Sequence, residues 1–165
     1  LAFGTNPFQI ENLTKLLRQA TPKPLIIKLT PNVTDITTIA KAAQDGGADA
    51  VSCINTLIGM VIDTQKKVTV LPMKTGGLSG PAIRPVGVAL TYKVSRAVSI
   101  PVIGIGGIMD ADDAIQYLLA GASAIQVGTG NFVDPSMAVN VLEGIKKYSE
   151  RENINSINEF HSFIQ

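Results

Sequence analysis

The chain has 165 residues and a mass of 17.4 kDa, which suits one domain or a large part of a larger one. Apolar residues make up 45% and charged residues 16%, a balance that supports a sizeable core and excludes a disordered chain. With 14 basic against 13 acidic residues and one cysteine, the sequence indicates neither a nucleic-acid-binding protein nor an internal disulfide. It has no apolar run of membrane-spanning length and no signal-peptide pattern at its start, so we expect a cytoplasmic protein without a membrane partner.

Short apolar runs of strand length alternate with amphipathic stretches along the chain. Apolar runs without polar alternation are typical of strands covered on both faces, as in parallel sheets. Apolar residues at i, i+3, i+4 and i+7 predict helices that bury one stripe. In chain order the pattern predicts a helix around 13–20, a strand at 25–29, a helix around 36–43, a strand at 49–53, a helix over about 85–98, a strand at 101–105, a helix around 111–118, a strand at 124–127 and a helix around 138–145. The buried stripe is Leu13, Leu16, Leu17 and Ala20 in the first helix and Ala138, Val141, Leu142 and Ile145 in the last.

Capping residues and turns agree with this order. Thr34 or Asp35 is expected to cap the second helix, Asp110 the helix around 111–118, and Pro135 to lie in the first turn of the last helix. The helix exits GGADAV and AGASAI repeat one helix-to-strand turn, which indicates β/α units. The segment 57–80 is too long for an ordinary βα connection, and its segments 61–62 and 68–71, which flank residues 65–67, predict a small hairpin.

These β/α units, with a long excursion after one strand, predict a TIM (β/α)8 barrel. Only four strands are found where that barrel has eight, so a four-stranded arc would leave two open edges and an uncovered inner face. We therefore expect residues 1–165 to form the carboxyl-terminal half, about four β/α units, of a single TIM-barrel domain whose first half is absent.

Two glycine clusters follow the last two predicted strands, GIGG at 104–107 and GTG at 128–130. Glycines there let backbone N–H groups approach an anion closely, and TIM barrels bind phosphate on the loops after strands seven and eight. A dinucleotide-binding fingerprint is excluded because Met109 replaces its third glycine and Gly128, not an acid, ends the next strand. Each cluster alone could be a tight turn, but together they predict a phosphate-bearing ligand.

Polar side chains also occur where strands end. Lys28 lies near the end of an apolar strand, where a cation is unfavourable unless it meets an anion, a ligand or the solvent at a rim. Asn55 and Thr56 follow the next strand and either contact a planar polar ligand or shape a turn. Cys53 is interpreted as a small core residue and His161 as a solvated helix residue, and no catalytic triad or metal-ligand spacing can be assembled.

Five motifs give the chain a specific resemblance: IIKLTPNVTDI, SCINTLIGMVID, KTGGLSGPAIRP, IPVIGIGGI and AIQVGTG. In this order and spacing they resemble the dihydroorotate dehydrogenases, and the class 1B catalytic subunit in particular. The resemblance implies an FMN-binding TIM barrel that oxidises dihydroorotate to orotate in de novo pyrimidine (UMP) biosynthesis. It also implies a homodimer of catalytic subunits bound to an iron–sulfur flavoprotein subunit, which carries FAD and an iron–sulfur cluster and passes electrons to NAD.

The resemblance further implies roles for individual residues. Lys28 matches a lysine beside the pyrimidine edge of the flavin, Ile54 a backbone contact to FMN, and Asn55 with Thr56 the pair that binds orotate. The remaining FMN contacts match Gly80, Gly106, Gly107, Gly128 and Thr129, the last four of them around the phosphate. The catalytic base of the family, a cysteine, belongs to a loop upstream of Leu1, so no catalytic residue is expected in this chain and the chain alone is expected to be inactive.

Two other functions remain open on the residues themselves. The glycine loops alone also suit another phosphate-binding TIM barrel, such as a phosphosugar isomerase or synthase, or a non-catalytic fragment that binds phosphate or assembles with other chains. Lys28 together with Asn55 and Thr56 favours the flavoenzyme.

Overall fold

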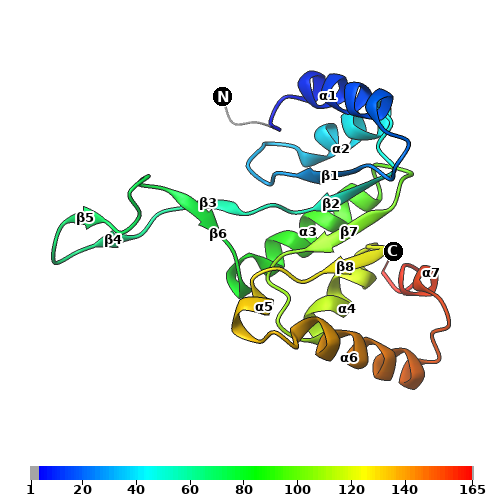
Figure 1. Cartoon of the computed structure of the whole chain (residues 1–165). Coiled ribbons are helices and arrows are strands. Elements are labelled where there is room, and N and C mark those ends of the chain that lie inside the picture. The colour runs from blue at the N-terminus through cyan, green and yellow to red at the C-terminus, as the bar shows by residue number, and fades with distance from the viewer. Residues whose placement is uncertain (1–3, 165) are drawn as a thin grey trace.

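The computed structural model describes residues 4–164 and is built around one parallel sheet (Figure 1). All four predicted strands are confirmed, and they lie in the order β1-β2-β7-β8. Their bounds are Ile26–Leu29 for β1, Ala50–Cys53 for β2, Val102–Ile105 for β7 and Ala124–Gln126 for β8. The register places Lys28 beside Ser52, and Ser52 beside Ile103. All the neighbouring strands are parallel, so their carboxyl ends meet at one edge of the sheet.

Helices alternate with these strands and cover one face of the sheet. They are α1 Pro7–Ala20, α2 Ile36–Asp45, α3 Arg84–Ser95 after a 3-10 turn η1 Pro81–Ile83, α4 Ala111–Leu119, α5 Gly130–Val133, α6 Met137–Glu152 and α7 Ile157–Phe160. The core contains Val51 and Val102 from the strands and Ile39 from α2. No helix within residues 4–164 is both long enough and apolar enough to cross a membrane.

Two of the predicted caps are confirmed and one is wrong. The Asp35 carboxylate accepts a hydrogen bond from the Thr37 amide at 2.9 Å, and Asp110 accepts one from the Asp113 amide at 2.9 Å. Pro135 is not in the first turn of α6, which begins at Met137. The short helix α5 uses residues 130–133, and Asp134 then accepts a bond from the Ser136 amide at 2.8 Å, which keeps Pro135 in the turn before α6.

The predicted stripes of the first and last helices are wrong in part. Leu16 is 64% exposed and Leu17 is also exposed, because α1 buries Ile10 and Thr14 instead. The orientation of α1 follows from the close contact of Thr14 with Gly46 at the end of α2. An added Cβ at Gly46 would lie only 2.5 Å from the Thr14 Cβ. On α6, Val141 is buried but Leu142 is 51% exposed. Both outer helices therefore carry apolar side chains that this core does not cover.

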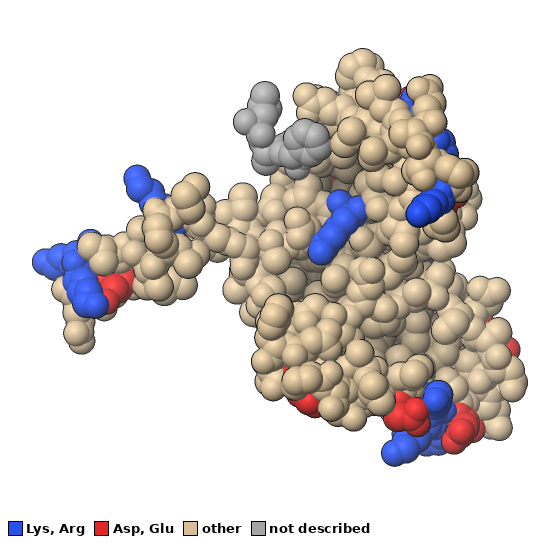
Figure 2. Space-filling view, viewed as in Figure 1, with Lys and Arg blue, Asp and Glu red and all other residues tan. Residues whose placement is uncertain are grey.

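The second face of the sheet is open along its two edge strands, whereas Ser52 in its middle is buried. Ile26 and Lys28 on β1 and Ala124 and Gln126 on β8 are exposed, and β1 and β8 are the edge strands of the described sheet. Figure 2 shows this face with few charged side chains over its middle.

A two-stranded arm projects from the end of β2 (Figure 1). Its distal part is the predicted hairpin, with β4 Ile62–Asp63 antiparallel to β5 Val68–Thr69. Its proximal part was not predicted and pairs β3 Leu57–Gly59 with β6 Gly76–Leu78. Figure 2 shows charged side chains gathered at the end of the arm, where Lys66 pairs with Asp63.

Candidate functional site

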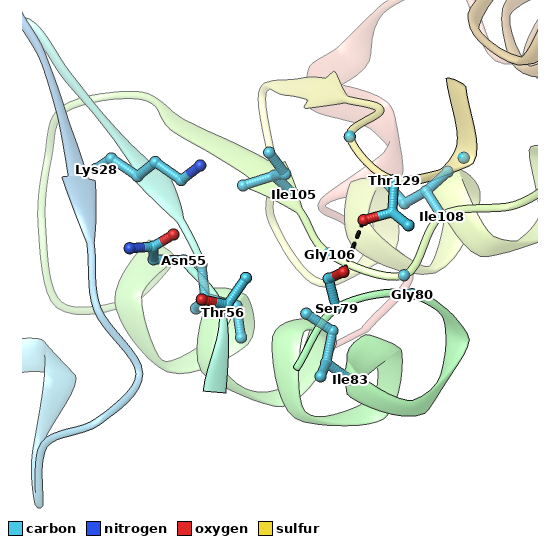
Figure 3. A pocket seen from close by; sticks show the side chains of 14 residues that line it. Lys28, Asn55, Thr56, Ser79, Gly80, Ile83, Ile105, Gly106, Ile108 and Thr129 are labelled. Atoms are coloured by element: carbon cyan, nitrogen blue, oxygen red, sulfur yellow. Dashed lines mark hydrogen bonds between the residues drawn. The ribbon is translucent and has the colours of Figure 1, made fainter. Parts of the chain in front are cut away.

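One pocket at the carboxyl ends of the four parallel strands brings together all nine predicted binding residues (Figure 3). They are Lys28, Ile54, Asn55, Thr56, Gly80, Gly106, Gly107, Gly128 and Thr129. The hollow has a cavity volume of about 110 Å³ and is partly open to solvent. Five further residues line it: Ser79, Ile83, Ile105, Ile108 and Gly130.

A polar end of the pocket is formed by Lys28, Asn55 and Thr56, which lie together on one side in Figure 3. The Asn55 amide donates to the Leu29 carbonyl at 2.8 Å, which extends the β1–β2 ladder by one residue and leaves the Asn55 side chain exposed. The Lys28 side chain is exposed and makes no ion pair or hydrogen bond with any residue of the described range. An ammonium group without a protein partner is free to meet an anionic or electron-rich group of a ligand.

Asn32 holds the backbone that follows Asn55, and sequence reasoning missed it. Its side-chain amide donates to the Thr56 carbonyl at 2.9 Å and accepts from the Ile58 amide at 3.0 Å. The Thr56 side chain packs closely against Gly77 of the arm. An added Cβ at Gly77 would lie only 2.3 Å from the Thr56 hydroxyl oxygen. Asn32 lies in the loop after β1, 24 residues before Thr56, so no local spacing indicates this contact.

The opposite end of the pocket is a backbone cradle. Gly80, Gly106 and Gly107 have φ of +82°, +138° and +70°, a region that disfavours residues with a Cβ. A Cβ at Gly107 would lie 2.6 Å from the Gly80 carbonyl oxygen, whereas one at Gly128 would meet nothing within 4 Å. Main-chain groups can thus approach a ligand closely, and the space beside Gly128 is open.

Two hydroxyl groups close this end. The Thr129 hydroxyl donates to the Ser79 hydroxyl at 2.8 Å, which joins the loop after β8 to the loop before η1. Ser79 was not singled out from the sequence, although it adjoins the predicted Gly80 in the KTGGLSGPAIRP motif. Hydroxyl groups and free backbone N–H groups are the donors that phosphate oxygens accept from.

Between the two ends the pocket has apolar walls, formed by Ile54, Ile83, Ile105 and Ile108. Ile54 and Ile83 are each 2% exposed and are therefore fixed in the core. The arrangement suits an elongated ligand with an anionic group beside the glycines, an apolar body, and a polar end beside Lys28. The open space at Gly128 and the Gly107 amide, which has no hydrogen-bond partner within residues 4–164, fit a phosphate group.

Cys53 and His161 lie outside the pocket. Cys53 is fully buried as predicted, and burial raises the pKa of its thiol to about 12, although a hydrogen bond from Thr91 opposes this shift. His161 is not fully solvated as predicted, because its Nε2 lies 3.0 Å from the Ala122 carbonyl oxygen and the residue is half-buried at the end of α7. Within residues 4–164 no group of three or more His, Cys, Asp or Glu side chains could hold a metal ion.

Comparison with known proteins places this chain in a family. The family model described as dihydroorotate dehydrogenase matches residues 1–148. The chain belongs to the dihydroorotate dehydrogenase family. The resemblance stated from the five motifs is thereby confirmed, and a phosphosugar isomerase or synthase is set aside.

Three relatives illustrate the match, each named dihydroorotate dehydrogenase B (NAD(+)), catalytic subunit. The protein of Alkaliphilus metalliredigens is 51% identical over 99% of this chain and 54% of its own length. Those of Alkaliphilus oremlandii and Geotalea uraniireducens are 53% and 52% identical, over 95% and 96% of this chain and 52% of their own lengths. The chain thus spans about half the length of these relatives.

Proposed function

We propose that this chain is the carboxyl-terminal half of the catalytic subunit of an FMN-dependent dihydroorotate dehydrogenase of the NAD type. The subunit oxidises dihydroorotate to orotate in de novo pyrimidine biosynthesis. The observation that carries the proposal is the pocket: nine residues chosen from family motifs, spread from Lys28 to Thr129, line one hollow in a chain that belongs to this family.

The half-barrel arrangement is supported by what the sheet leaves uncovered. Edge strands with free backbone groups and an exposed inner face are unfavourable unless another segment covers them. Ile26 on the inner face of β1 is 45% exposed, and Leu16 and Leu142 are exposed on the two outer helices. Four further β/α units would pair with β1 and β8 and cover these apolar side chains, which closes a TIM barrel.

FMN suits both ends of the pocket. Its phosphate would lie among Gly106, Gly107, Gly128 and Thr129, where backbone N–H groups and a hydroxyl can donate to it. Bound FMN supplies a two-electron acceptor. At the other end Lys28 provides a positive charge that favours negative charge developing beside it, and Asn55 with Thr56 would hydrogen-bond the polar groups of dihydroorotate and orotate.

A base is still needed to remove the proton from dihydroorotate, and it must come within hydrogen-bond reach of the reacting carbon. Within residues 4–164 the one thiol, that of Cys53, is buried and has a raised pKa, so it cannot serve. We therefore place the catalytic cysteine of the family upstream of Leu1 and propose that the 165-residue chain alone is inactive.

Electron transfer from FMN requires a partner. The relatives carry the words "catalytic subunit" and "NAD(+)" in their names, which supports a second subunit that passes electrons to NAD. We propose that this partner is an iron–sulfur flavoprotein with FAD and an iron–sulfur cluster, bound to a homodimer of catalytic subunits. Co-purification from the native source tests this assembly, and robust turnover with fumarate and no partner contradicts it.

The cofactor and the reaction are tested on the full-length catalytic subunit that contains this chain. The purified protein is expected to carry one FMN per subunit, seen as the visible absorbance band of flavin, and dihydroorotate is expected to bleach that band without oxygen. A folded subunit without flavin, or a flavin that dihydroorotate does not reduce, refutes the proposed function.

A further inference from the structure

Helix α4 contacts the loop of the glycine cradle through two side chains one turn apart, Asp113 and Tyr117. The buried Asp113 carboxylate pairs with Arg84 and accepts a hydrogen bond from the Met109 amide at 2.9 Å. The Tyr117 hydroxyl donates to the Gly106 carbonyl at 2.6 Å. Because residues four apart share one face of a helix, a single face of α4 holds both ends of the loop.

The Tyr117 side chain occupies a socket that two glycines leave open. An added Cβ at Gly87 of α3 would lie 2.0 Å from the Tyr117 hydroxyl oxygen, and one at Gly104 of β7 would lie 2.6 Å from its ring. Tyr117 is fully buried, and Gly106 is the one hydrogen-bond partner of its hydroxyl within residues 4–164. Burial raises the pKa of Tyr117, so the hydroxyl stays protonated and acts as a donor.

The hydrogen bond from Tyr117 sets the orientation of the peptide between Gly106 and Gly107. In a trans peptide the carbonyl and the N–H point in opposite directions, and this peptide is trans. Because the Gly106 carbonyl points to Tyr117 in the core, the Gly107 N–H points the other way, toward the pocket that Gly107 lines. Gly107 makes no hydrogen bond with any residue of the described range.

We propose that Tyr117 is a positioning residue, which aims the free Gly107 amide at the phosphate of the bound ligand. The inference rests on the proposed function, since it takes FMN as that ligand. A hydroxyl that acts only through this amide affects ligands with a phosphate and leaves others unaffected. That selectivity distinguishes positioning from a general contribution to the core.

The test compares FMN with riboflavin, which has the same ring system and no phosphate. In the full-length catalytic subunit, Tyr117→Phe keeps the ring in its socket and removes the hydroxyl. We expect the Kd for FMN to rise about tenfold and the Kd for riboflavin to change by less than about twofold. Fluorescence titration of the apoprotein gives both values, and thermal unfolding shows that the variant is folded.

Two further variants complete the design. Ser95→Ala removes a half-buried hydroxyl, which donates to the Ala120 carbonyl at 3.0 Å outside the pocket, and should change neither Kd. Gly87→Ala favours the helix but pushes the Tyr117 hydroxyl away, so it should reproduce the selective loss of FMN. Equal losses for both flavins, or unchanged FMN affinity in Tyr117→Phe, overturn the role of Tyr117 and leave the proposed function intact. An unaltered subunit that binds neither flavin refutes the proposed function, and this inference with it.

Discussion

Gly128 is the position where a side chain should expel the ligand with least damage to the fold. A Cβ there meets no heavy atom within 4 Å, and its φ lies outside the left-handed region. Gly128→Val should therefore change the free energy of unfolding of the apoprotein by no more than about 0.5 kcal/mol. The same side chain would fill the space that we assign to the phosphate. If it removes two hydrogen bonds to a charged group at about 1.5–3 kcal/mol each, the loss is about 3–6 kcal/mol.

That loss predicts a rise of at least about 100-fold in the Kd for FMN. Fluorescence titration of the apoprotein measures it, and chemical denaturation measures stability. Gly59→Val, in the arm and outside the pocket, is the matched control and should retain FMN. Gly107→Ala gives the contrast, because its Cβ would lie 2.6 Å from the Gly80 carbonyl oxygen at a φ of +70°, so it should lose stability as well. Stoichiometric FMN in a folded Gly128→Val subunit would refute the phosphate assignment.

Three more predictions concern the polar end of the pocket and the core. Lys28→Ala should slow flavin reduction by dihydroorotate by about tenfold or more while dihydroorotate binding changes less, since the charge matters most as the flavin is reduced. Stopped-flow reduction at several substrate concentrations separates the reduction rate from the binding affinity. Unchanged reduction rates would contradict the role proposed for Lys28. Asn55→Ala should weaken orotate binding by about 1–3 kcal/mol, measured by titration, and unaltered affinity would remove Asn55 from the substrate site. Because burial raises the pKa of Cys53 to about 12 from 9.0, the unfolded thiol ionises first and stability falls as pH rises above 9.0. Relative to Cys53→Ala, the parent should lose about 1 kcal/mol per pH unit on average between pH 9 and 11. The same pH dependence of the unfolding free energy in both proteins would show that Cys53 is not buried as described.

The sheet and the pocket residues could be predicted because their signals are local. Each apolar run became a strand of the parallel sheet, and the residues after β2, β7 and β8 lie at its carboxyl edge whatever the rest of the chain does. The stripe on α1 failed for the opposite reason. Periodicity groups Leu16 with Leu17 on one face, but the contact between Gly46 and Thr14 decides which face meets α2. Such a contact joins residues 32 positions apart, and no local pattern reveals it.

Asn32, Ser79 and Tyr117 were missed for the same reason. Asn32, Ser79 and Tyr117 act through backbone groups or hydroxyls that lie 24, 50 and 11 residues away. As single polar or aromatic residues they match no motif for binding. The sequence signal for Tyr117 exists only in the combination of Gly87 and Gly104. Together these two glycines leave space for an aromatic ring, and neither glycine alone predicts it.

Strand register also supports our proposal that the one thiol of the described chain, that of Cys53, is not the catalytic base. Lys28 pairs with Ser52, whereas Cys53 pairs with Leu29 and Gly104. Successive residues of a strand point to opposite faces, so Lys28 points to the open face and Cys53 into the core beneath the helices. Bringing the thiol to the Lys28 face would need a one-residue slip of β2, which would also turn Val51 out of the core. If dihydroorotate binds beside Asn55 as we propose, its base comes from another segment, above the face that carries Lys28, where we place the other half of the barrel.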